Sequence, residues 1–102
     1  MARYPGRSYT HDYGPLKVTA VSKEGTYVVT VRRPSDGYEV TIDTLERNPL
    51  EASRYALDVL ATAWKMMRAR DVHLERFDLR RAAEEIGQDA FEVLEQIVEG
   101  EN

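Results

Sequence analysis

Residues 16–43 read LKVTAVSKEGTYVVTVRRPSDGYEVTID, and this stretch decides the fold. Apolar and polar side chains alternate along it with a period of two, and β-branched residues are in excess, which is typical of β-strands. The segments KEG at 23–25 and PSDG at 34–37 are typical turn formers and divide the stretch. We therefore predict three antiparallel strands, with one apolar and one polar face, over residues 16–22, 26–32 and 38–43.

A long amphipathic helix is expected next. Asn48 can cap the first free backbone amides, Pro49 suits the first helical position, and Glu51 is placed to complete a capping box. Apolar residues then recur at spacings of three and four, in two adjoining stripes. This wide apolar surface predicts a helix over residues 49–70 that is buried on two sides, with Trp64 in the core.

The C-terminal segment is acidic and amphipathic. Asp78 can cap a helix that begins at Leu79, whereas Gly87 favours a helix stop before a second capping box at 89–92. We expect one or two short helices here, and prefer two, over 79–86 and 90–99. The predicted fold class is α+β, with a three-stranded antiparallel β-meander packed on one long α-helix, followed by one or two short acidic C-terminal helices.

The first residues of the chain combine tyrosine, arginine, proline and glycine without an apolar periodicity. We interpret residues 1–15 as an extended N-terminal arm and residues 16–102 as a single α+β domain. Tyrosine and arginine are enriched among interface hot spots, so this arm is a candidate recognition segment. Its candidate partner-binding residues are Tyr4, Arg7, Tyr9 and Tyr13.

Composition excludes several classes of protein. The chain has 102 residues, 42% of them hydrophobic and 31% charged, as in globular proteins. The absence of cysteine excludes disulfides, thiolate metal sites and cysteine nucleophiles. The sequence shows no apolar run of membrane-spanning length and no signal-peptide pattern at its start, so we expect a cytoplasmic protein without membrane contact.

Charge is uneven along the chain. The formal net charge is −4, yet residues 82–102 hold seven acids and neither lysine nor arginine. The preceding residues hold all 14 cations and 11 acids, so they carry a positive surplus. Such asymmetry bears on association with a partner rather than on the fold.

Catalytic constellations are not found in the sequence. His11 and Asp12 are consecutive and point opposite ways in an extended chain, and His73 has no partner at zinc-ligand spacing. A glycine-rich phosphate loop and a nucleophile elbow are also missing. We therefore predict a protein that is not an enzyme and has no metal site, catalytic residue or cofactor.

Two resemblances concern nucleic acid. RRAAEEIG at 80–87 is similar to the first helix and turn of the helix-turn-helix of bacterial regulators, yet the segment that would read DNA carries three glutamates and no cation. The order of three strands and a helix resembles plant AP2-type and phage integrase arm-binding domains. That resemblance implies a nucleic-acid-binding domain that uses the sheet and the basic arm, which we keep as the alternative function.

By elimination, we predict a small non-enzymatic protein-binding module that acts as an inhibitor, adaptor or regulator. In size and acidity it is similar to phage-type anti-defence inhibitors, including anti-CRISPR proteins, which suggests a viral or bacterial role. The expected partner is a protein, with a basic nucleic-acid-binding surface as one candidate, and a homo-oligomer through sheet edges is a further alternative. Besides the arm, the candidate partner-binding residues are Arg32, Arg33, Glu84, Glu92, Glu95 and Glu99.

Overall fold

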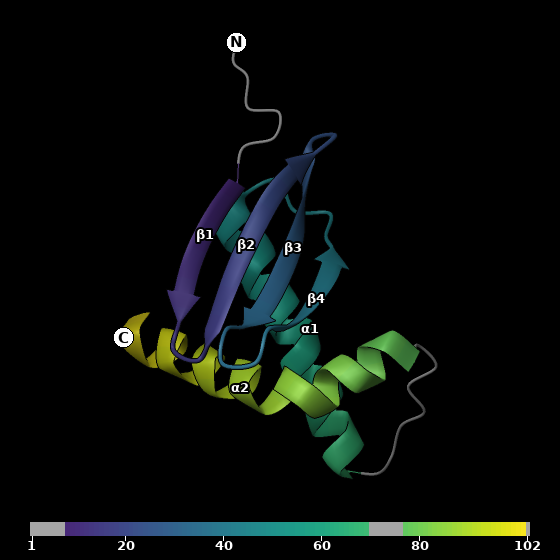
Figure 1. The fold of residues 1–102 in the computed structure, drawn as a ribbon. Helices are drawn as coiled ribbons and strands as arrows, with labels where there is room; N and C mark the ends of the chain where they lie inside the picture. Colours follow the sequence, from purple (N-terminus) through teal and green to yellow (C-terminus); the bar gives the residue numbers. More distant parts are fainter. Residues whose placement is uncertain (1–7, 70–76, 102) are drawn as a thin grey trace. The chain divides into compact units, whose positions relative to one another are not determined.

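Four strands and two helices form the part of the chain that the structure, a computed structural model, describes, residues 8–69 and 77–101 (Figure 1). The fold class is α+β, as predicted. The elements are β1 (Ser8–Tyr13), β2 (Leu16–Lys23), β3 (Thr26–Arg33), β4 (Tyr38–Asp43), α1 (Pro49–Ala69) and α2 (Phe77–Glu101). The strands form one antiparallel sheet in the order β1-β2-β3-β4.

The sheet has four strands rather than the three predicted. The three expected strands are confirmed to within one residue at each end, and β1 is added from residues assigned to an extended arm. Tyr13 pairs with Leu16, so Gly14 and Pro15 alone connect β1 to β2. Gly14 has a φ of +58°, and proline fixes the next φ near −65°, which is the sign pattern of a type II′ hairpin turn. Glycine followed by proline is therefore a hairpin turn here, and residues 8–13 are a strand instead of part of an extended arm.

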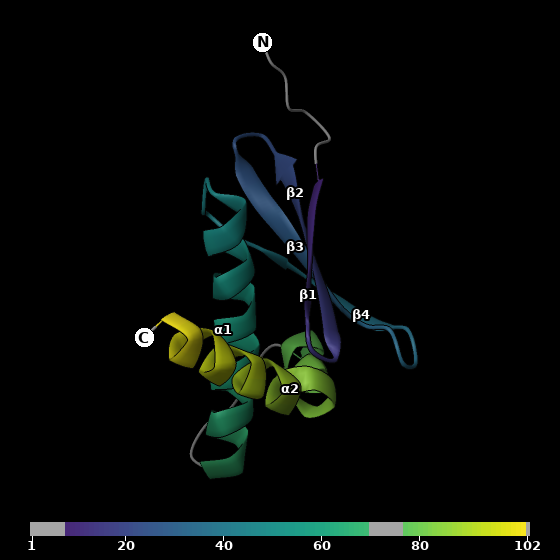
Figure 2. The same ribbon diagram turned by 90° about the vertical axis from the view of Figure 1, so that its left-hand side faces the viewer.

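The two faces of the sheet differ in burial. Side chains on the inner face of the two central strands are almost fully buried, namely Leu16, Val18, Ala20, Val29 and Val31. On the outer face every side chain of the four strands is half-buried or exposed. The first turns of α1, residues 49–56, lie on one side of the sheet (Figure 2), and Ala52 and Ala56 are fully buried there. The predicted alternation is confirmed.

The start of α1 has the predicted Asn48 cap, whereas no hydrogen bond between the Glu51 carboxylate and the Asn48 amide is found among the described residues. The Asn48 side-chain oxygen accepts hydrogen bonds from the amides of Leu50 at 2.9 Å and Glu51 at 3.1 Å. The Asn48 carbonyl accepts the first helical bond, from Ala52 at 2.9 Å. These bonds satisfy amides that a helix start otherwise leaves without partners, and they fix α1 to begin at Pro49.

Contacts group the described residues into two units that divide inside α1, between Ala56 and Leu57. In the second unit, the C-terminal part of α1 and α2 share a core of small and medium side chains. Its buried members are Leu57, Leu60, Ala61, Ala63, Ala82, Ala83, Ile86, Ala90 and Val93. Whether residues 16–102 behave as a single domain stays a prediction.

The preferred interpretation of the C-terminal segment as two helices is wrong, because α2 runs unbroken from Phe77 to Glu101. Gly87 is fully inside this helix and buried. A Cβ at this position would collide with the Cβ of Trp64 and lie 3.0 Å from the carbonyl oxygen of Leu60. Glycine is therefore needed for the close approach of α2 to α1, and the sequence pattern for a helix stop was misleading here.

We expect Gly87→Ala to destabilise the protein. Overpacking typically costs about 1–3 kcal/mol, and Trp64 Cβ sits at the base of its side chain, where it cannot move aside. The severe overlap with Trp64 Cβ places the cost in the upper part of this range, and alanine regains about 1 kcal/mol of helix propensity, so the net loss in unfolding free energy should be about 1–2 kcal/mol. Urea denaturation measures it. Gln88→Ala, at the exposed neighbouring position, is the control and should stay within about 0.5 kcal/mol. A Gly87→Ala variant as stable as the parent would contradict the close approach.

Candidate functional site

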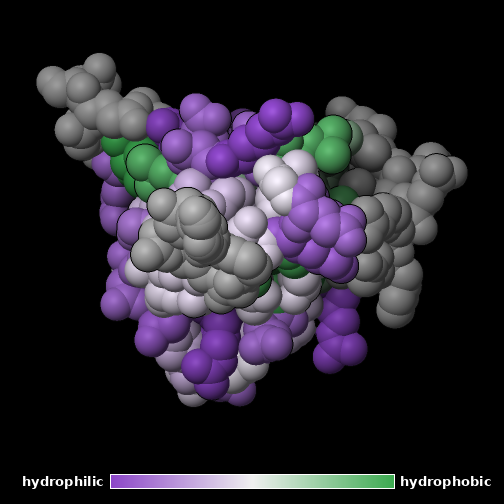
Figure 3. All heavy atoms as spheres, turned by 90° about the horizontal axis from the view of Figure 1, so that it is seen from above, coloured by the Kyte–Doolittle hydropathy of each residue, from purple (hydrophilic) through white to green (hydrophobic). Residues whose placement is uncertain are grey.

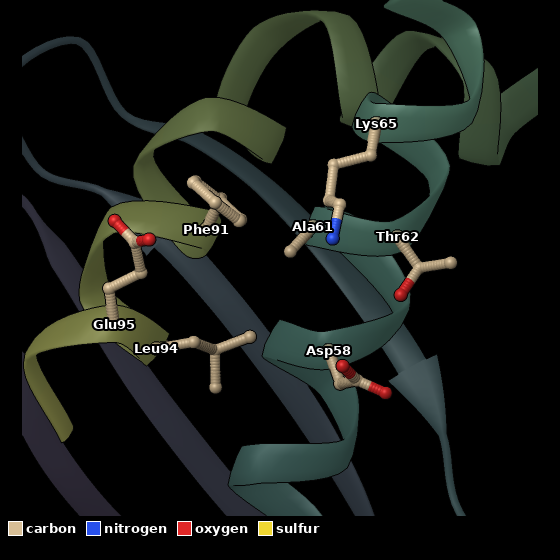
Figure 4. A pocket seen from close by; sticks show the side chains of 7 residues that line it. All are labelled: Asp58, Ala61, Thr62, Lys65, Phe91, Leu94 and Glu95. Carbon is tan, nitrogen blue, oxygen red and sulfur yellow. The ribbon is translucent and has the colours of Figure 1, made fainter. Parts of the chain in front are cut away.

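A hollow of about 360 Å³ lies between the two helices of the second unit (Figure 4). It is lined from α1 by Asp58, Ala61, Thr62 and Lys65, and from α2 by Phe91, Leu94 and Glu95. We call these seven residues the α1–α2 groove. Its volume falls in the range of about 300–1,000 Å³ that is typical of ligand pockets.

The groove has an apolar floor and a charged rim. Ala61 is buried, and Phe91 and Leu94 are half-buried and extend from α2 toward α1 (Figure 4). Two carboxylates, of Asp58 and Glu95, and one ammonium, of Lys65, stand at exposed positions around this floor. An apolar centre inside a polar rim is the usual anatomy of a protein-binding surface.

Aromatic and cationic side chains pack beside the groove. The ring centroids of Trp64 and Phe91 lie 5.5 Å apart. The Lys65 ammonium lies 5.4 Å from the centre of the Phe91 ring, and the Arg68 guanidinium lies 5.2 Å from the Trp64 ring. Cations at this distance are attracted to the ring face. Trp64 is half-buried, so its predicted place in a closed core is wrong.

Three of the predicted partner-binding glutamates lie together on α2. Glu84, Glu92 and Glu95 are exposed, and their spacing places them along one side of the helix. We call these three residues the acidic stripe. Glu84 is 3.9 Å from the Arg80 guanidinium, and the Gln88 amide donates a hydrogen bond of 3.2 Å to Glu92. Glu95 also lines the groove, so the stripe and the groove adjoin.

The tyrosines of the predicted arm lie in the sheet. Tyr9 pairs with Ala20 and Tyr13 with Leu16, so both are on the inner face, and both are half-buried. Tyr9 meets the Tyr27 ring edge-on at 6.1 Å. Burial raises the pKa of Tyr13, and the positive charge of Arg54 offsets part of this rise. Their role in partner binding stays a prediction.

Two arginines predicted to bind a partner stand apart from the groove residues in sequence and differ in setting. Arg32 is exposed on the outer face of the sheet. Arg33 folds into the predicted 34–37 turn, where its Nε donates a hydrogen bond of 2.9 Å to Asp36. Tyr4 and Arg7 lie outside the described residues. Glu99 is within α2, but its side chain is outside what the structure describes.

A row of four threonines crosses the outer face of the sheet, with one threonine on each strand. Thr10, Thr19, Thr30 and Thr41 are opposite one another on successive strands. The hydroxyl oxygens of Thr10 and Thr19 are 3.1 Å apart, and so are those of Thr30 and Thr41. The charged residues of this face are three cations and three anions, Lys17, Lys23, Arg32, Asp12, Glu39 and Asp43. This balance gives little support to nucleic-acid binding, which depends on neutralising phosphates.

Sequence reasoning missed most of the groove. Asp58, Thr62 and Lys65 follow one another at helical spacing on exposed positions of α1, and this spacing was the available signal. By itself, this spacing on α1 predicts only a solvent-facing side for Asp58 and Lys65, and it does not indicate a groove. Phe91 was not predicted as a binding residue, because candidates on this segment were selected for their charge.

The described residues hold no group of three or more histidine, cysteine, aspartate or glutamate side chains that could bind a metal ion. Of the helices described, neither is long and apolar enough to cross a bilayer. When the chain is compared with protein-family models, curated proteins and solved structures, none of them matches. The arguments about function therefore rest on the residues themselves.

The interaction of Arg33 with Asp36 in the 34–37 turn can be tested by titration. Hydrogen bonds from Arg33 and from the Tyr38 amide lower the pKa of Asp36 from its ordinary value of 3.8 to about 2. Because the pKa of Asp36 is lower in the folded protein, its ionised carboxylate stabilises the fold at pH values above the ordinary pKa. This stabilisation is lost as the pH falls through about 2. We expect a carboxyl NMR titration to place the Asp36 midpoint near 2, and to move it upward in Arg33→Met. A midpoint that stays at the ordinary value in the parent would show that the pair does not form.

Proposed function

We propose that this chain is a small protein-binding module, acting as an inhibitor, adaptor or regulator, that docks through the α1–α2 groove and the adjoining acidic stripe. The observation that carries the proposal is the position of Glu95, which belongs to both surfaces. One partner segment can therefore place an apolar side chain on the groove floor and cations against the stripe.

The chemistry of the groove defines the partner. Ala61, Phe91 and Leu94 offer apolar contact at the centre, where interfaces gain most of their affinity. Asp58 and Glu95 stand on the rim together with a single cation, Lys65. We infer a partner protein whose binding segment combines an apolar side chain with lysine or arginine. A basic nucleic-acid-binding surface of another protein has this composition.

Electrostatics also argues for protein over nucleic acid as the ligand. Exposed carboxylates on α2 attract a basic protein and speed its encounter, whereas they repel phosphates. The outer face of the sheet has balanced charge and so offers no compensating attraction. Nucleic-acid binding by the sheet is therefore the alternative that the experiment must be able to reveal.

The test compares three forms of the full chain as immobilised baits in lysate of the source organism. One is the parent, and one carries Glu84→Gln, Glu92→Gln and Glu95→Gln. The third is a charge-matched control with Glu24→Gln, Glu39→Gln and Glu51→Gln, at exposed positions outside the acidic stripe. We expect a protein that the parent and the control capture and the stripe variant does not. Circular dichroism checks that all three forms remain folded.

The rate of association with the captured protein then tests whether charge complementarity drives the binding. The association rate of the stripe variant should fall roughly tenfold and lose most of its salt dependence, because charge complementarity acts mainly on encounter. Equal losses in the stripe variant and the charge-matched control would assign the effect to net charge and contradict a specific docking surface. Capture of nucleic acid that increases in the stripe variant would establish the alternative function instead.

A further inference from the structure

A second surface, in the first unit, exposes hydrophobic side chains that nothing in the proposed function uses. Seen from above (Figure 3), hydrophobic side chains show as small green areas within a mainly hydrophilic surface. The large hydrophobic residues most exposed among those described are Leu45 at 89%, Leu50 at 51% and Tyr55 at 45%. All three fall within eleven residues of the chain, at the entry to α1 and in its first turns. Leu45 and Tyr55 line one hollow and so share a surface, whereas Leu50 lies outside that hollow.

Leu45 is held in place by a fixed segment of backbone. The Thr44 amide donates a hydrogen bond of 3.1 Å to the Tyr27 carbonyl, and the Thr44 hydroxyl donates one of 2.7 Å to the same carbonyl. On the other side of Leu45, the Glu46 amide donates to the Thr44 hydroxyl at 3.2 Å, and the Glu46 carbonyl accepts from the Tyr27 amide at 3.1 Å. Thr44 itself is 5% exposed. The residues that flank Leu45 are thus bonded to β3 on both sides.

This anchoring lowers the entropy cost of binding through Leu45. A side chain on a mobile loop loses backbone freedom when a partner orders it, whereas here the backbone is already ordered. The exposure of Leu45 is therefore a property of a fixed conformation and is not relieved by a small movement of the loop.

A hollow of about 210 Å³ adjoins Leu45. It is lined by Asp43, Thr44, Leu45, Glu46 and Tyr55, which we call the Leu45 surface. Its two carboxylates form no ion pair within the described residues. Two cations, Arg47 and Arg54, are close in sequence, but neither lines the hollow.

We propose that the Leu45 surface is a second docking site, and that its occupant is a protein segment in which an apolar side chain is flanked by lysine or arginine. Leu45 and Tyr55 contact the apolar side chain, and Asp43 and Glu46 pair with the flanking cations. The choice of occupant rests on charge complementarity, because the lining carries two negative charges and no positive one. The site lies in the first unit and is independent of the α1–α2 groove.

The test is an NMR titration of the ¹⁵N-labelled full chain with a synthetic peptide in which two leucines are flanked by pairs of lysines. Two companion peptides replace the lysines with glutamine or with glutamate. We expect the lysine peptide to shift the amides of Thr44, Leu45, Glu46 and Tyr55, and to bind more tightly than the glutamine peptide. The glutamate peptide should bind least.

Three variants assign the contacts. Leu45→Ala should weaken binding of the lysine peptide by roughly fivefold or more, since it removes most of the apolar area that the residue presents. Leu50→Ala, at an exposed leucine outside the hollow, is the control and should change affinity by less than about twofold. Asp43→Asn with Glu46→Gln should abolish the preference for lysine over glutamine.

Four outcomes would overturn the proposal. They are no binding of the lysine peptide at millimolar concentration, equal binding of the three peptides, equal losses in Leu45→Ala and Leu50→Ala, and shifts confined to α2. The last result would support the acidic stripe as the docking site, so the two proposals fail separately. Shifts at Leu45 that depend on protein concentration alone, without peptide, would show that a second copy of this chain is the occupant, and would overturn the choice of partner made here.

Discussion

Strand register is the constraint on which the sheet depends. Because side chains alternate between the two faces, a slip of one residue would turn Leu16, Val18 and Ala20 outward and bury their polar neighbours. Two-residue turns after Tyr13 and after Lys23 leave no slack for such a slip. The second of these turns holds Glu24 at a φ of +54°, which is rare for a residue other than glycine. The chain thus accepts some backbone strain where the register is set.

In the helical unit, small residues allow α1 and α2 to pack closely. Alanines at 61, 63, 82, 83 and 90 are buried, and glycine at 87 lets α2 come close to α1. Phe91 and Leu94, about one and two helical turns after Gly87, are half-buried. The α1–α2 groove is thus bounded by the large side chains that follow the contact on α2.

Local signals in the sequence predicted the local structure well. Three predicted features depend only on neighbours in sequence, and all three are confirmed. They are the alternation over residues 16–43, the turn at residues 34–37 and the Asn48 cap. Gly87 failed as a predictor because its meaning depends on Trp64, a residue on another helix. Strand β1 was missed because Gly14 and Pro15 obscured the alternation of Tyr9, His11 and Tyr13. The acidic stripe could be read from helical spacing, whereas the groove required knowing which side of α1 faces α2.

The threonine row on the outer face has a consequence for solubility. Threonine has nearly the shape of valine and a similar preference for strands, but it presents a hydroxyl to water. Four valines in its place would join Val21 and Val28, which stand in the neighbouring row, and extend one apolar area across the whole width of the sheet. An exposed apolar area of that extent favours association with other copies of the chain. The four hydroxyl groups therefore keep this row of the outer face polar and divide what would otherwise be one apolar area.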